Sequence, residues 1–193
     1  MIQIYPEIKG LIFDCDGTLV DSMPIHMAAW ERAFSDFGES CPDEFLDPLK
    51  GMLEEEIVDL YNRRFNRSIN SAKLVREKHR YFRKNIGKIK PITPVVELAE
   101  SYYKKLPMAV VSGGKQENVH SELEIVNIKH LFTAILTADD RIKPKPAPDI
   151  FLEAAKRLNV EPQFCQVFED GDIGLEAARK AGMAVTDIRL YLA

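Results

Sequence analysis

The chain has 193 residues, which suits one medium-sized domain or a core with a small inserted domain. Hydrophobic residues make up 46%, and the net charge of -4 argues against non-specific nucleic-acid binding, which needs a basic surface. Three cysteines are too few for a disulfide framework, no apolar run is long enough to cross a bilayer, and the N-terminus lacks a signal-peptide pattern. We expect a soluble, cytoplasmic protein that binds neither nucleic acid nor membrane.

Short apolar runs without alternation predict strands that are buried on both faces. The first covers residues 10–13, and further runs lie at 108–111, 134–136, 166–168 and 184–188. Amphipathic helical patterns around 150–158 and 173–181 lie between some of these runs. Strands that alternate with helices predict an α/β core with a parallel sheet between two helical layers.

Residues 22–90 contain no strand candidate. A stripe at helical spacing predicts a helix that ends at Gly38, and its members are Met23, Met27, Trp30, Phe34 and Phe37. Further helices are predicted over 54–65 and 71–85, and a linker over 85–94. The simplest organisation is a small helical cap domain (22–90) inserted into a core formed by residues 1–21 and 91–193.

Two aspartates follow the first predicted strand directly. Asp14 and Asp16 are two positions apart, so an extended chain would point both carboxylates to one site. Ligands of open α/β sheets bind at the carboxyl ends of strands, and two close carboxylates repel unless a hard cation such as Mg²⁺ lies between them. The alternative is a pair of loop acids with turn and capping roles.

The string DCDGTLVDS at residues 14–22 resembles the first signature motif of the haloacid dehalogenase (HAD) superfamily. Its three other motifs resemble segments that follow in the same order, each at a predicted strand end: MAVVSG at 108–113, KPAPD at 145–149, and VFED at 167–170 followed by GLEAARKAGM at 174–183. The resemblance spans residues 9–188. It implies a HAD-like Rossmannoid three-layer core with an all-helical cap.

The resemblance also implies a role for each matched residue. Asp14 would attack phosphorus and form an aspartyl-phosphate, and Asp16 would act as general acid and then as general base. Ser112 and Lys145 would bind the phosphoryl oxygens. The implied Mg²⁺ ligands are Asp14, the backbone carbonyl of Asp16, Glu169 and Asp170.

Residue types alone leave alternatives open. Ser112 could cap a helix, Lys145 could be a solvated surface lysine, and Glu169 with Asp170 could cap the helix that follows. The glycines after Ser112, together with Lys115, favour a phosphate cradle of hydroxyl and backbone N–H groups at a helix start. Gly113 and Lys115 are therefore predicted to bind phosphate.

The cap begins with a second resemblance. The string DSMPIHMAAW at residues 21–30 is similar to the DTxxxHxxAW pattern of the β-phosphoglucomutase-like branch of the family. This implies that His26 lies near Asp16, close to the substrate, and influences when Asp16 engages. An ordinary core or surface histidine is the alternative, and Trp30 fits a packing role.

Two features separate phosphatase from mutase. Glu54 stands in the acidic stretch 50–56, where the mutases of this branch are implied to carry an arginine for a second phosphate. Basic residues that could still contact a second phosphate are Lys50, Arg76, Lys78 and Arg80. The string at 167–190 is more similar to small bacterial fructose-1-phosphate and 6-phosphogluconate phosphatases.

We therefore expect a Mg²⁺-dependent phosphatase that acts on a small sugar phosphate, as a monomer or weak homodimer. The alternative is a β-phosphoglucomutase-like phosphohexomutase. A rival of another class is a non-catalytic HAD module that binds a phosphorylated metabolite or a protein. Dehalogenation is disfavoured, because Asp16 and the full set of metal-ligating acids indicate phosphoryl transfer.

Overall fold

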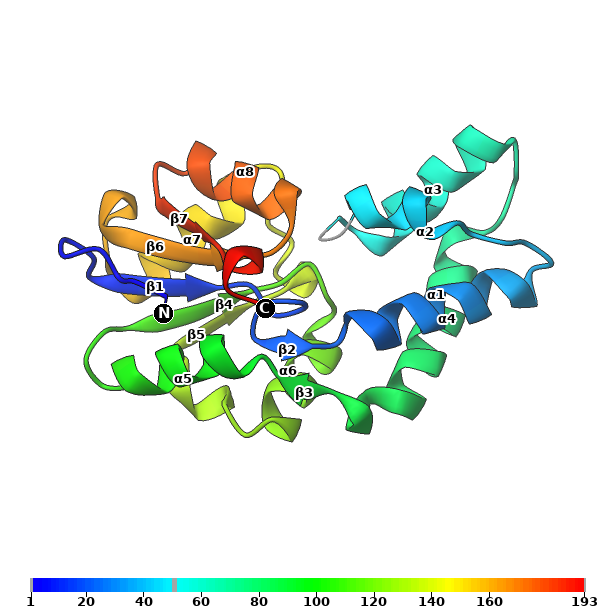
Figure 1. Cartoon of the computed structure of the whole chain (residues 1–193). Coiled ribbons are helices and arrows are strands. Elements are labelled where there is room, and N and C mark those ends of the chain that lie inside the picture. Colours follow the sequence, from blue (N-terminus) through cyan, green and yellow to red (C-terminus); the bar gives the residue numbers. More distant parts are fainter. Residues whose placement is uncertain (1, 50–51, 193) are drawn as a thin grey trace.

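The computed structural model describes residues 2–49 and 52–192 (Figure 1). Lys50 and Gly51, at the start of the acidic cap stretch, lie outside the described residues. The ribbon has two parts, a sheet sandwiched by helices and a group of helices at one end of it. None of the helices in the described ranges is long and apolar enough to span a membrane.

The core is a five-stranded parallel sheet with the order β5-β4-β1-β6-β7. Its strands are β1 (Gly10–Phe13), β4 (Met108–Val111), β5 (Ala134–Leu136), β6 (Cys165–Glu169) and β7 (Ala184–Asp187). Each coincides with a predicted apolar run to within one residue at either end. Every residue of β1, β4 and β6 is buried, as unbroken apolar runs predict for strands covered on both faces.

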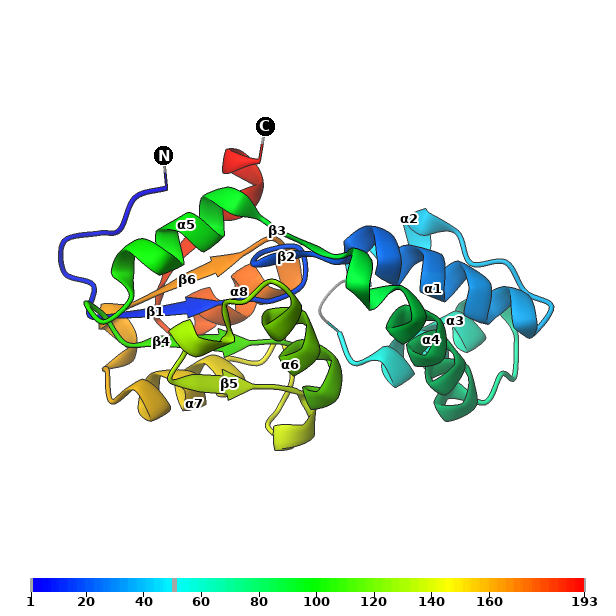
Figure 2. The same ribbon diagram turned by 90° about the horizontal axis from the view of Figure 1, so that it is seen from below.

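Four helices cover the two faces of this sheet (Figure 2). They are α5 (Thr93–Tyr102), α6 (Gln116–Ile125), α7 (Asp149–Leu158) and α8 (Asp172–Lys180). Side chains of α5 and α6 pack with Phe13 in one hydrophobic cluster, whereas those of α7 and α8 pack with Ile12 in another. Because Ile12 and Phe13 are neighbours on β1, their side chains mark opposite faces of the sheet. The predicted three-layer α/β class is confirmed.

The helical insert has its own core. Its helices are α1 (Met23–Asp36), α2 (Asp43–Leu46), α3 (Glu54–Phe65) and α4 (Ser71–Asn85), and they enclose a cluster that includes Trp30, Phe34 and Tyr61. The bounds of α3 and α4 are those predicted from hydrophobic periodicity, whereas α2 was not predicted. Trp30 packs in this cluster, which confirms its packing role.

Two short strands join the insert to the core. β2 (Val20–Asp21) pairs antiparallel with β3 (Lys90–Pro91), so the chain enters and leaves the insert side by side. The predicted linker 85–94 contains a short 3₁₀ helix (Ile86–Lys88), β3 and the first two residues of α5. The division into 22–90 and the two core segments stays a prediction, and these strands lie at its boundaries.

Short 3₁₀ helices occur in several connecting segments. They are η1 (Asp47–Leu49), η2 (Ile86–Lys88), η3 (Lys129–Leu131), η4 (Ala138–Asp140), η5 (Pro162–Phe164) and η6 (Ile188–Tyr191).

Candidate active site

The carboxyl ends of the three central strands meet at the edge of the sheet that faces the insert. Asp14 follows β1, Ser112 follows β4, and Glu169 is the last residue of β6. The Asp14 backbone N–H donates to the carbonyl of Phe168 at 2.9 Å, so the ladder between β1 and β6 continues to Asp14 itself. An open pocket lies between this edge and the insert, and it encloses about 750 Å³ when the solvent-open space at its mouth is included.

Three carboxylates cluster on the core side of this pocket. Oxygens of Asp14, Glu169 and Asp170 all lie within 4.8 Å of one another. The Lys145 ammonium donates to Asp14 Oδ1 at 2.6 Å and to Glu169 Oε2 at 2.7 Å. Lys145 is 4% exposed, so its alternative as a solvated surface lysine is wrong.

The titration of these groups reflects their crowding. Burial, together with the charge of Glu169, raises the pKa of Asp14 well above its ordinary value and that of Asp170 to about 6. Burial lowers the pKa of Lys145, but the two carboxylates outweigh it and hold this pKa above the ordinary value. The cluster thus carries more negative charge than its single ammonium group balances.

The carboxylates of Asp170 and Glu169 occupy space that is free only because two neighbouring residues are glycines. A Cβ on Gly17, whose φ is +80°, would overlap the Asp170 carboxylate, and a Cβ on Gly174 would overlap that of Glu169. Glu169 Oε1 also accepts the backbone N–H groups of Asp170 and Gly171 at 3.2 and 3.0 Å, at the start of α8. Glu169 therefore holds the turn before α8 with one oxygen and keeps the other in the cluster, but it does not cap the helix, because the N-cap residue is Gly171 and receives no side-chain cap hydrogen bond.

This donor set fits a hard dication. Mg²⁺ prefers oxygen ligands and binds through a few carboxylates, and a cation would relieve the repulsion that, added to burial, raises the pKa of Asp14 and Asp170. Asp14, Glu169 and Asp170 are the residues that would hold it. The Asp16 carboxylate contacts Ser22, His26 and Ser112 and not this cluster. Metal ligation by the Asp16 backbone carbonyl stays a prediction.

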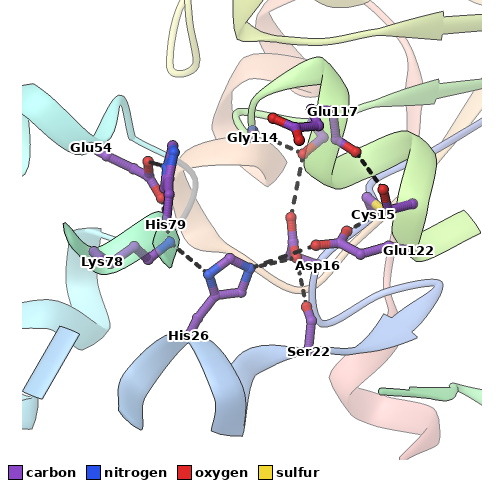
Figure 3. A network of polar contacts seen from close by, with 12 residues as sticks. Cys15, Asp16, Ser22, His26, Glu54, Lys78, His79, Gly114, Glu117 and Glu122 are labelled. Carbon is purple, nitrogen blue, oxygen red and sulfur yellow. Dashed lines mark hydrogen bonds and ion pairs between the residues drawn. The ribbon is translucent and has the colours of Figure 1, made fainter. Parts of the chain in front are cut away.

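Asp16 lines the same pocket as Asp14, but its carboxylate faces the insert (Figure 3). Its Oδ1 accepts the hydroxyl of Ser22 at 2.6 Å and lies 2.9 Å from His26 Nε2. Its Oδ2 accepts the hydroxyl of Ser112 at 3.3 Å. The structure thus brings His26 beside Asp16, at the position that the branch resemblance implies.

The contacts of His26 define its tautomer. The Lys78 ammonium lies 2.7 Å from His26 Nδ1, and an ammonium can only donate, so Nδ1 accepts and Nε2–H donates to Asp16. Burial and the Lys78 charge lower the pKa of His26, which keeps the ring neutral. Burial would raise the pKa of Asp16, but His26, Ser22 and Lys78 together lower it to about 2. Asp16 is therefore ionised in this arrangement.

The segment after β4 forms a tight turn at the pocket. Ser112 Oγ accepts the backbone N–H of Gly114 at 3.0 Å, and Ser112, Gly113 and Gly114 all line the pocket. Lys115 is the N-cap residue of α6, so the alternative in which Ser112 caps a helix is wrong. Lys115 does not line the pocket, and its side chain, 49% exposed, pairs with Asp139 at 3.7 Å. Of the other predicted phosphate-binding residues, Ser112, Gly113 and His26 line the pocket, whereas Lys145 contacts Asp14 and Glu169 without lining it.

Sequence reasoning missed Glu122, a carboxylic acid on α6 directly behind Asp16. It is 1% exposed and accepts the Cys15 thiol at 3.3 Å. Burial, together with the charge of Asp16, raises the pKa of Glu122 to about 9, so it is protonated at neutral pH. An acid between Val119 and Leu123 on the buried face of a helix is a signal that periodicity could have found.

The pairing of Glu54 with Lys78 and His79 is also a finding of the structure. Lys78 and His79 lie on α4, Glu54 is the first residue of α3, and Glu54 and Lys78 line the pocket. The Lys78 side chain is only 1% exposed. The sequence around Lys78 does not predict this burial, because its partners Glu54 and His26 come from other helices. Glu54 was predicted to be important only through its charge.

Known proteins show similarity over nearly the whole chain. The family model described as haloacid dehalogenase-like hydrolase matches residues 11–188. Fructose-1-phosphate phosphatase YqaB of Escherichia coli (strain K12) is 35% identical over 188 residues, covering 97% of this chain and 100% of that protein. β-Phosphoglucomutase of Bacillus subtilis (strain 168) is 28% identical, covering 91% of this chain and 81% of that protein. The crystal structure of a hydrolase from Pseudomonas syringae has a TM-score of 0.84 at 26% identity and covers 92% of this chain and 83% of that chain. The chain therefore belongs to the haloacid dehalogenase-like hydrolase family.

Proposed function

We propose that this hydrolase is a Mg²⁺-dependent phosphatase that acts on a small sugar phosphate, of the fructose-1-phosphate or 6-phosphogluconate type, through an aspartyl-phosphate intermediate. The observation that carries the proposal is the buried cluster of Asp14, Glu169 and Asp170 around Lys145, with Asp16 lining the same pocket. The similarity to fructose-1-phosphate phosphatase YqaB along the full length of both chains supports it.

The proposed reaction has two steps. A carboxylate oxygen of Asp14 attacks phosphorus, the bond from phosphorus to the sugar oxygen breaks, and that oxygen takes a proton from Asp16. Water then attacks phosphorus, Asp16 takes the proton of the water, and inorganic phosphate leaves Asp14. Since Asp16 is ionised in this arrangement, it is ready for the second step and must gain a proton before the first.

Other residues position the groups that react. The Ser112 hydroxyl and the backbone of Gly113 line the pocket where the phosphoryl oxygens would be held. Lys145 fixes the Asp14 carboxylate through a 2.6 Å hydrogen bond and offsets negative charge. Mg²⁺, when bound, supplies the positive charge that an incoming phosphate needs beside these carboxylates.

The mutase alternative needs a free cation on the insert side of the pocket to hold a second phosphoryl group. Among the described residues that line the pocket, Lys78 is the only lysine or arginine on that side, and it is paired with Glu54. Lys50 lies outside the described residues, and Arg76 and Arg80 do not line the pocket. This pairing favours the phosphatase.

The test is a screen of phosphorylated sugars for release of inorganic phosphate, with Mg²⁺ and with EDTA. We expect release with Mg²⁺, its loss in EDTA, and restoration when Mg²⁺ is added back. Asp14→Asn should lower turnover by at least about a thousandfold, because the amide is a poor nucleophile. Full turnover in EDTA would contradict the metal requirement, and full turnover by the variant would contradict the role of Asp14.

Two further readouts separate the rivals. Release of phosphate from fructose 1-phosphate supports the phosphatase, whereas conversion of β-glucose 1-phosphate to glucose 6-phosphate without release supports the mutase. If para-nitrophenyl phosphate is not hydrolysed with Mg²⁺ present, the non-catalytic binding module becomes the better interpretation.

A further inference from the structure

The two sides of the pocket differ in chemistry. The core side carries the carboxylates that the proposed mechanism uses. The side formed by the insert is largely apolar, with Met27, Trp30, Leu49 and Met52 among its lining residues. A substrate whose phosphoryl group is held at the core side would place its distal end against this insert side. The charges there therefore decide which distal groups are accepted.

Glu54 is the acidic residue that lines the pocket from the insert. One of its carboxylate oxygens pairs with the Lys78 ammonium and the other with His79 Nε2 (Figure 3). Burial would raise the pKa of Glu54, but Lys78 and His79 outweigh it and hold this pKa below the ordinary value, so the carboxylate is ionised. Each carboxylate oxygen has two acceptor positions, so each keeps one for a hydroxyl donor.

The Lys78 ammonium is less accessible from the pocket than the Glu54 carboxylate. Its side chain is 1% exposed, against 17% for Glu54, so an incoming group meets the carboxylate first. The ammonium is already engaged by Glu54 and by His26 Nδ1, and it lies 5.3 Å from the centre of the Trp30 ring. The neutral His26 ring adds no charge on this side.

We infer that Glu54 is a specificity-determining residue, which selects sugar monophosphates whose distal end is uncharged and bears hydroxyl groups. This inference rests on the proposed phosphatase function and, of the two substrate types proposed there, favours fructose 1-phosphate over 6-phosphogluconate. A distal hydroxyl can donate to the Glu54 carboxylate, while the apolar side chains contact the carbon skeleton. A distal phosphoryl or carboxylate group would instead face an anion whose countercharge is buried, and repulsion at this range changes rates by at least about tenfold.

Two matched pairs of probes isolate the distal charge. Fructose 1,6-bisphosphate differs from fructose 1-phosphate by a second phosphoryl group. 6-Phosphogluconate differs from glucitol 6-phosphate, which is also an open chain, by a distal carboxylate in place of a hydroxymethyl group. We expect the full chain with Mg²⁺ to show a kcat/KM at least about tenfold higher for the neutral member of each pair. Glu54→Gln keeps an oxygen acceptor for Lys78 but leaves that ammonium uncompensated. The preference should then fall by about tenfold or more, mainly through a lower KM for the anionic member.

Glu55→Gln is the matched control, since it removes the same charge from the exposed next residue of α3 and should keep the wild-type preference. If Glu54→Gln does not fold, Met52→Lys adds a cation to the insert side with the Glu54 pair intact and should shift the preference in the same direction. Turnover of para-nitrophenyl phosphate without a preference for the neutral members, or with a preference that neither variant changes, overturns the inference about Glu54 alone. No turnover of any compound refutes the proposed function itself.

Discussion

Replacement of Glu122 by glutamine should stabilise the protein. The Glu122 side chain is buried on α6, accepts the Cys15 thiol at 3.3 Å and faces the ionised Asp16. Glutamine has the same shape, keeps an oxygen acceptor for the thiol and supplies an N–H group where the protonated acid has its O–H. Glu122→Gln therefore imitates the protonated form of the acid at every pH.

The size of the effect follows from proton linkage. Burial raises the pKa of Glu122 from 4.5 to about 9. For an acid with a raised folded-state pKa, stability is greatest below the unfolded pKa and falls as the pH rises toward the folded pKa, because the unfolded chain releases a proton that the folded chain must keep. Each pH unit in this window costs about 1.4 kcal/mol, which gives at most about 3 kcal/mol at pH 7 and about 6 kcal/mol at pH 9. The variant avoids this cost.

The assay is urea unfolding of the wild type and the variant at about pH 5.5, pH 7 and pH 8.5, because the linkage window spans these values. The advantage of Glu122→Gln in the free energy of unfolding should be about 1 kcal/mol at the lowest pH and should grow at each step. Glu124→Gln, on the same helix but exposed, is the matched control and should stay within about 0.5 kcal/mol of the wild type. An advantage that does not change between the lowest and highest pH would refute the reasoning.

Other predictions test the core side of the site. Gly174→Ala should lower the free energy of unfolding by several kcal/mol (about 3 or more), because its Cβ would overlap Glu169; Gly87→Ala, whose Cβ meets nothing within 4 Å, is the control in urea titrations. Lys145→Met should cost about 3–5 kcal/mol, since it leaves two buried carboxylates without their shared cation, and unchanged stability would contradict that ion pairing. Mg²⁺ should raise the Tm of the wild type, and Asp170→Asn should reduce that shift; an equal shift in both would remove Asp170 from the proposed ligands.

Local patterns predicted those elements whose formation depends on burial. The three central strands β1, β4 and β6 are buried along their whole length, so they leave short, mainly apolar runs without alternation in the sequence. The helices α3 and α4 each bury one face, which leaves a period of 3.6 residues. The strands β2 and β3 have two residues each, and their exposed members Asp21 and Lys90 pair only because the insert returns the chain to its starting point. Such pairing leaves no pattern in either segment.

The residues of the candidate site also fall into those that sequence patterns predicted and those that they did not. Asp14 and Glu169 lie where strands end, so strand prediction and motif order together predicted that they meet. Lys145 lies in a loop, and only its matching motif indicated that it would be buried beside both acids. Glu122 and Lys78 bind partners from distant segments, which sequence position alone does not bring together. Lys115 shows the reverse, because its position next to the glycine turn suggested a phosphate contact but its side chain turns to Asp139.

The charge distribution of the pocket explains why phosphate binding and the metal are linked. Asp14, Glu169 and Asp170 lie around a single ammonium group, that of Lys145, and the ionised Asp16 lines the same pocket, so the core side by itself repels an anion. Burial, together with the repulsion between these carboxylates, raises the pKa of Asp14 and of Asp170. On the insert side, the charge of Lys78 is balanced by Glu54. Neither side therefore attracts phosphate by itself. A dication on the acidic cluster would make the core side bind a phosphoryl group. Glu54 would repel a second anionic group from the insert side.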